Sequence, residues 1–145
     1  MDGPNFSLTL PSELRMLSVA RGFVDAICSA YDLDRTTTHA LVIVTGEVIT
    51  NIVRHAHQHR PDAQMQMHIQ ILPDAVVMRF EDEGSPFDLE SVPQLPPGEM
   101  RIGGRGVFLM RTLMDELTYE PRREGGGGNV MRMVKRREKS MRECG

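Results

Sequence analysis

The chain has 145 residues, with 17 Lys and Arg against 20 Asp and Glu, and a formal net charge of -3. This length indicates one domain, and the lack of a basic excess argues against a protein built around nucleic-acid phosphates. The 2 cysteines, Cys28 and Cys144, exclude a disulfide framework and a four-cysteine zinc site. The 11 methionines and the absence of tryptophan predict an aliphatic core filled largely with Met.

The sequence predicts neither a membrane span nor a leader. No apolar run approaches the roughly 18–20 residues that cross a bilayer, and no basic segment followed by a hydrophobic stretch begins the chain. We therefore expect a cytoplasmic protein without membrane contact. We expect a single domain over residues 1–145, with its core at about 7–137 and a charged, solvated tail at 138–145.

Two helices are predicted in the first half of the chain, after a short strand at residues 5–10. Apolar residues recur every three to four positions from Ser12, a candidate N-cap, to about Tyr31. Asp34 is expected to cap a second helix that runs over residues 35–56. Because this helix is apolar over most of its circumference, we expect it to be central.

Strands dominate the predicted second half. Residues 63–72 alternate between apolar and polar, which predicts a strand with one wet face, and a turn leads to its partner strand at 75–81. The Pro-rich residues 82–103 have no periodicity and predict a long functional or disordered loop. A helix at 104–114 and strands at 117–120 and 129–135 complete the chain. This order predicts an α+β two-layer sandwich, with a mixed, mostly antiparallel sheet and helices on one face.

A polar stripe interrupts the apolar second helix. Glu47, Asn51 and His55 follow one another at four-residue intervals, each displaced by about 40° around an α-helix. The stripe is either a functional face or simply the solvent face of the helix. His55, His57 and His59 could suggest a metal cluster, but neighbours two apart on a helix point in different directions, and a zinc site would need further ligands.

Two further clusters follow. Asp82 and Gly84 lie at a strand end, which is typical of a turn but also places a carboxylate where it could accept hydrogen bonds from an amine. Gly103, Gly104 and Gly106 lie at the opening of the predicted helix, and glycines there let backbone N–H groups approach an anion. The cluster is neither a Walker P-loop, which requires Lys where Gly104 stands, nor a dinucleotide fingerprint.

Taken together and in order, the three clusters resemble the GHKL, or Bergerat-type, ATP-binding fold that gyrase, histidine kinases and MutL share. The segments GEVITNIVRHAH, FEDEGSPFD, GGRGVFLMRTLMDEL and GGGNVMRMVKR are most similar to the branch of anti-sigma factor serine kinases. The resemblance spans about residues 7–137. It implies that the chain binds ATP and Mg²⁺.

The resemblance implies a role for each matched residue. Asn51 would ligate Mg²⁺ and Glu47 would be the general base that accepts a proton from the attacking hydroxyl. Asp82 would accept a hydrogen bond from the adenine amino group, beside Gly84, and His55 would line the phosphate side.

A lid over the phosphates is also implied. Gly104 and Gly106 would form its hinge and phosphate cradle, while Arg101 or Arg105 could neutralise γ-phosphate charge. Many relatives carry Gly-Thr in the last strand, with the hydroxyl at the nucleotide site. Here Gly128-Asn129 stands in that place, and the Asn129 amide can form hydrogen bonds too.

The implied activity is that of an anti-sigma factor serine/threonine protein kinase. It would phosphorylate a STAS-domain anti-anti-sigma protein, sequester a sigma factor and form a homodimer. The alternative is a nucleotide-regulated module that sequesters its partner without kinase activity.

Overall fold

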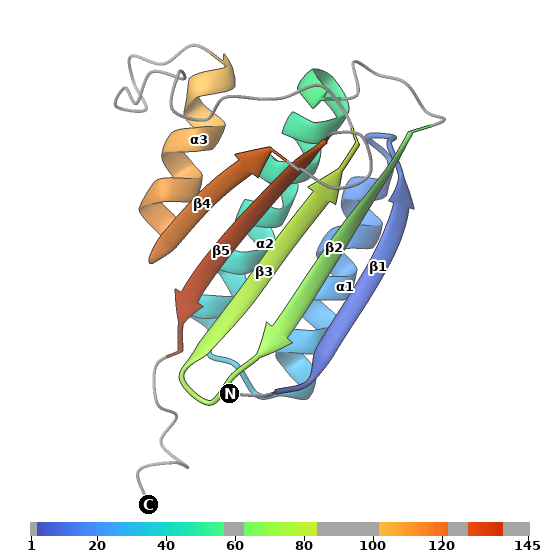
Figure 1. Cartoon of the computed structure of the whole chain (residues 1–145). Coiled ribbons are helices and arrows are strands. Elements are labelled where there is room, and N and C mark those ends of the chain that lie inside the picture. The colour runs from blue at the N-terminus through green and yellow to red at the C-terminus, as the bar shows by residue number, and fades with distance from the viewer. Residues whose placement is uncertain (1–2, 57–62, 84–101, 122–127, 138–145) are drawn as a thin grey trace, which may run out of the picture.

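The computed structural model describes residues 3–56, 63–83, 102–121 and 128–137. Within these ranges, five strands form one sheet that helices cover on one side (Figure 1). The strands are β1 (Asn5–Pro11), β2 (Gln64–Ile71), β3 (Ala75–Asp82), β4 (Glu116–Pro121) and β5 (Asn129–Arg136). The helices are α1 (Met16–Ala30), α2 (Arg35–Asn51) and α3 (Ile102–Leu113), and the π-helical turn η1 (Ile52–Ala56) continues α2.

The sheet has the strand order β1-β2-β3-β5-β4, so the last strand of the chain lies between β3 and β4. Every pairing among these strands is antiparallel, and the predicted mixed sheet is therefore wholly antiparallel in the part that the structure describes. The register places Asp82 opposite Asn129 and Tyr119 opposite Met131. The predicted α+β sandwich is confirmed.

The core lies between the sheet and helices α1 and α2, which cover its far face in Figure 1. Methionine supplies much of this core, as the composition predicts. The alternation of β2 places its apolar residues inside, and the same period-two pattern buries the inner face of β5. The buried methionines are Met65, Met67, Met78, Met110, Met114, Met131 and Met133.

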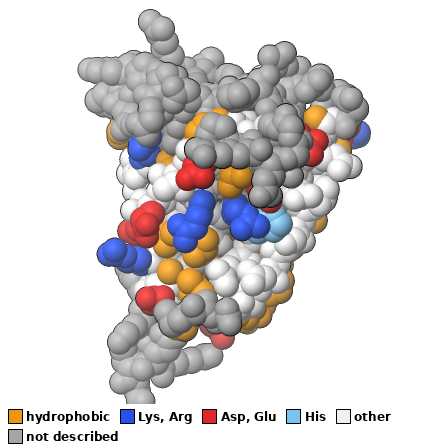
Figure 2. Space-filling model, in the orientation of Figure 1, with side chains coloured by type: hydrophobic (Ala, Val, Ile, Leu, Met, Phe, Trp, Pro, Cys, Tyr) orange, Lys and Arg blue, Asp and Glu red, His pale blue; other side chains and the backbone are white. Residues whose placement is uncertain are grey.

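The opposite face of the sheet carries charged and neutral polar side chains with hydrophobic ones among them, as Figure 2 shows. Ser7 Oγ lies 2.7 Å from His68 Nδ1, and His68 Nε2 lies 2.9 Å from a carboxylate oxygen of Glu81. These contacts link β1, β2 and β3 side by side, because the register aligns Ser7 with His68. The wet face predicted for residues 63–72 is confirmed.

The starts of the two long helices differ from one another. Asp34 caps α2 as predicted, since its carboxylate accepts a 3.0 Å hydrogen bond from the Thr37 N–H. The predicted cap at Ser12 is wrong, because α1 begins at Met16 after a turn. The N–H of Ser12 instead donates to the carbonyl of Ala63 and extends the pairing of β1 beyond Pro11.

The second helix ends in a π-helical turn after Asn51, within the predicted range of 35–56. The stretch Arg35–Arg54 is long and apolar enough to cross a membrane by length and composition, which the sequence inspection missed. Of its 18-residue window, 61% is buried inside the protein. That burial is typical of a core helix and agrees with the predicted central position.

The third helix begins at Ile102, two residues before the predicted start at Gly104. Its end is held against the sheet, because Lys135 Nζ donates a 2.8 Å hydrogen bond to the carbonyl of Leu113. The free thiol of Cys28 is buried, as predicted from its apolar neighbours. Most of the predicted loop at 82–103 and all of the tail at 138–145, including Cys144, lie outside the described residues.

Candidate functional site

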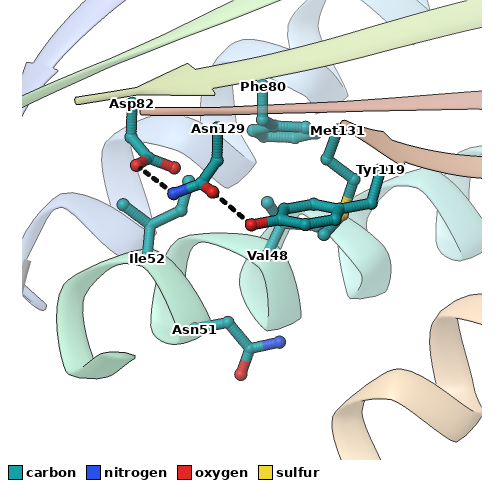
Figure 3. A pocket seen from close by; sticks show the side chains of 8 residues that line it. All are labelled: Val48, Asn51, Ile52, Phe80, Asp82, Tyr119, Asn129 and Met131. Atoms are coloured by element: carbon teal, nitrogen blue, oxygen red, sulfur yellow. Dashed lines mark hydrogen bonds between the residues drawn. The ribbon is translucent and has the colours of Figure 1, made fainter. Parts of the chain in front are cut away.

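A pocket lies between α2 and the ends of β3, β4 and β5. The empty space among its lining residues is about 320 Å³, a figure that includes open solvent. Half of its eight lining residues are apolar, which suits a flat group, and the other half carry a polar group. The lining residues are Val48, Asn51, Ile52, Phe80, Asp82, Tyr119, Asn129 and Met131 (Figure 3).

A chain of hydrogen bonds crosses the strand side of the pocket. Asn129 Nδ2 donates a 2.8 Å hydrogen bond to Asp82 Oδ1, and the hydroxyl of Tyr119 donates to Asn129 Oδ1. Figure 3 shows the three side chains pointing toward one another. Asp82 is 4% exposed and Asn129 is 3% exposed, so these bonds form in a region where water screens them little.

Asn51 lies on the other side of the pocket, at the last position of α2. Its Nδ2 atom is buried and has no hydrogen-bond partner among the residues that the structure describes. A buried donor without a partner costs roughly 1–3 kcal/mol. A ligand oxygen in the pocket would remove that cost.

The backbone at Gly128 brings the two polar strand ends together. Gly128 has φ +117°, a conformation that L side chains rarely adopt, and a Cβ there would lie 2.9 Å from the Cα of Glu83 and closer still to the carbonyl oxygen of Asp82. The lack of a side chain therefore lets β5 start directly beside the end of β3. That approach sets Asn129 against Asp82.

Three of the predicted site residues meet in this pocket, namely Asn51, Asp82 and Asn129. Glu47 is half-buried on α2 one turn before Asn51 and is not among the lining residues. His55 lies in the π-helical turn. The α-helical spacing that aligned it with Glu47 and Asn51 therefore does not hold at that position.

The structure describes only some of the residues predicted for the lid. Gly84 and Arg101, like His57 and His59, lie outside the described residues. The backbone of Gly104, Arg105 and Gly106 lies inside α3, which begins at Ile102. The prediction of a helix that opens on these glycines is therefore confirmed, and only its first residue differs.

Tyr119 is the polar lining residue that the sequence inspection missed. The alternation of β4 could have placed it on the inner face with Leu117, since both are half-buried between exposed neighbours. Its contact with Asn129 depends on β5 lying between β3 and β4, which local pattern does not reveal.

Residues 10–135 match the family model described as the histidine kinase-like ATPase domain. The chain belongs to this family. The predicted GHKL resemblance is thereby confirmed for most of the chain.

Curated relatives of this ATPase domain are named serine-protein kinase RsbW. One from Listeria innocua is 34% identical over 119 residues, which cover 77% of this chain and 76% of the relative. One from Listeria monocytogenes serovar 1/2a is 35% identical over the same length and shares. One from Bacillus subtilis is 24% identical over 121 residues, which cover 78% of this chain and 76% of the relative.

A solved structure shares the fold of this ATPase domain. The structure of the RsbU and RsbW domains of Rv1364c from Mycobacterium tuberculosis aligns with a TM-score of 0.68 at 14% sequence identity. The alignment covers 94% of this chain and 33% of that one.

Proposed function

We propose that the chain is an ATP-dependent serine/threonine protein kinase that acts as an anti-sigma factor. The observation that supports this most is the pocket that Asn51 and the buried pair of Asp82 and Asn129 line together, in a chain 34% identical to serine-protein kinase RsbW. Its proposed acceptor is a STAS-domain anti-anti-sigma protein. The chain would hold a sigma factor when that antagonist is phosphorylated, and it would work as a cytoplasmic homodimer.

The donor set of the pocket fits an adenine nucleotide. Adenine is flat, and the apolar walls at Val48, Ile52 and Phe80 could enclose it. Asp82 is an acceptor for the exocyclic amino group, because an ionised carboxylate only accepts hydrogen bonds. Gly84 would let the base and its water approach the backbone.

The phosphates are proposed to lie toward Asn51. Its buried amide nitrogen can donate to a phosphate oxygen, and its amide oxygen suits Mg²⁺, which prefers oxygen ligands. When bound, Mg²⁺ supplies charge neutralisation on the phosphates. His55 would line the same side, and Arg101 or Arg105 would meet the γ-phosphate near Gly104 and Gly106 at the start of α3.

Glu47 is the proposed general base. Its carboxylate would accept the proton of the attacking serine or threonine hydroxyl. That oxygen would then form its bond to the γ-phosphorus, and the bond from that phosphorus to the ADP leaving group would break. The half-buried position one turn before Asn51 keeps Glu47 close to the proposed phosphate side without placing it in the pocket wall.

The test is transfer of labelled γ-phosphate from Mg-ATP to a purified STAS-domain protein. We expect an acid-stable phosphoserine or phosphothreonine with the wild type. Glu47→Gln should abolish transfer while nucleotide binding stays intact, and Glu116→Gln, an exposed change on β4, serves as the matched control. Retained transfer by Glu47→Gln would refute the base assignment.

A second function is a nucleotide-regulated sequestering module without transfer. Asn129 favours it, because this amide stands where many relatives have the hydroxyl of Gly-Thr. That function predicts a nucleotide-dependent complex with the partner and no phosphorylated product. The same assay therefore separates the two functions.

A further inference from the structure

Tyr119 lines the pocket and is also linked to the pocket carboxylate through another side chain. Its hydroxyl donates to Asn129 Oδ1, and Asn129 Nδ2 donates onward to Asp82 Oδ1 at 2.8 Å. The three residues belong to β4, β5 and β3, which are neighbours in the sheet. The chain of bonds therefore links the pocket carboxylate to the outermost strand.

The direction of each bond follows from the chemistry of the groups. An ionised carboxylate accepts only, so Asp82 requires the NH₂ end of the Asn129 amide. That choice turns Asn129 Oδ1 toward Tyr119, whose hydroxyl must then donate its proton. With Phe at position 119 the amide would lose the hydrogen bond from this hydroxyl, and its NH₂ group would be held less firmly against Asp82.

The orientation of the Asp82 carboxylate matters for choosing a base. Adenine presents an amino donor at the position where guanine presents a carbonyl acceptor. A fixed carboxylate favours the donor and repels the acceptor, and hydrogen bonds weaken steeply when the angle falls below about 120°. The low exposure of Asp82 and Asn129 strengthens both effects.

We infer that Tyr119 is a positioning residue that acts through Asn129 to fix Asp82 for adenine over guanine. This rests on the proposed nucleotide site. A purely structural Tyr119 would support β4 against β5 and leave base preference unchanged.

The experiment measures the dissociation constants of ATP and GTP for the full chain by calorimetric titration. We expect the wild type to prefer ATP and Tyr119→Phe to lower the ATP/GTP preference by roughly 3- to 10-fold, the effect of losing about one neutral hydrogen bond. Tyr31→Phe is the matched control. Its ring packs edge-to-face on Phe6 with centroids 5.9 Å apart, and we expect its preference to stay at the wild-type value.

Asn129→Ala keeps the inference testable if Tyr119→Phe does not fold. It removes both hydrogen bonds and should lower the preference at least as much. Adding Tyr119→Phe to Asn129→Ala should produce no further change, because the route from Tyr119 to Asp82 is already cut.

The outcomes separate this inference from the proposed function. A wild type that binds no ATP overturns both. A wild type that binds ATP and GTP equally, or a Tyr119→Phe protein that melts at a lower temperature with an unchanged ATP/GTP preference, overturns the inference and leaves the nucleotide site standing.

Discussion

Gly128→Ala is the change that the backbone geometry predicts to be most damaging at the pocket. The glycine has φ +117°, and a new Cβ would lie 2.9 Å from the Cα of Glu83 and nearer still to the Asp82 carbonyl. Backbone strain of this kind costs roughly 1–3 kcal/mol, and crowding between packed strands a further 1–3 kcal/mol or so. We therefore expect the free energy of unfolding to fall by about 2–6 kcal/mol, a large part of the roughly 5–15 kcal/mol of a typical domain.

A second glycine provides the matched control. Gly22 lies inside α1, where a Cβ would meet nothing within 4 Å. Gly22→Ala should raise the free energy of unfolding by about 0.5–1 kcal/mol, because alanine loses less backbone entropy in a helix.

Urea unfolding followed by circular dichroism measures both variants against the wild type. Opposite changes in the unfolding midpoint are expected, down for Gly128→Ala and up for Gly22→Ala. Wild-type stability of Gly128→Ala would refute the argument that β5 can begin beside Asp82 only without a side chain at position 128.

Three further changes test the fold. Asp34→Ala should lower the free energy of unfolding by about 0.5–2 kcal/mol through loss of the α2 cap. Burial raises the pKa of Asp34, but hydrogen bonds from Thr37 outweigh burial and lower this pKa overall. The difference in free energy of unfolding between the wild type and Asp34→Ala should therefore be full above the ordinary pKa of about 3.8 and shrink as the pH falls below it. Met78→Ala, at a position 0% exposed, should cost about 2–5 kcal/mol in urea unfolding, and a loss below 1 kcal/mol would contradict its place in the core. Burial raises the pKa of the Cys28 thiol, which is 2% exposed, so a thiol reagent should label it rapidly in urea and slowly in buffer; equal rates would show that the site opens.

Local pattern predicts most of the elements here because each element has a clear period. The alternation from Met65 to Ile71 predicts strand β2, and Asp34 predicts the start of helix α2. The start of α1 was misplaced because Ser12 is equally suited to a cap and to a sheet edge, and its hydrogen bond to Ala63, just before β2, joins residues more than 50 positions apart.

The site was predictable where the residues form motifs along the chain, as at Asn51 and Asp82. It was not predictable where contacts depend on strand order. Tyr119 meets Asn129 only because β5 pairs with both β3 and β4, and the sequence order alone permits other arrangements. The shift in helical phase after Asn51 was also hidden, since the π-helical turn has no clear sequence pattern.

The central claim is that the pocket beside Asp82 binds the adenine of ATP. Calorimetric titration of ATP with Mg²⁺ into the wild type and into Asp82→Asn tests it most directly, because the amide keeps the shape and removes the charged acceptor. The account predicts one ATP bound per wild-type chain and binding at least tenfold weaker, about 1.4 kcal/mol, in the folded Asp82→Asn protein. Equal affinity in the two proteins would contradict it.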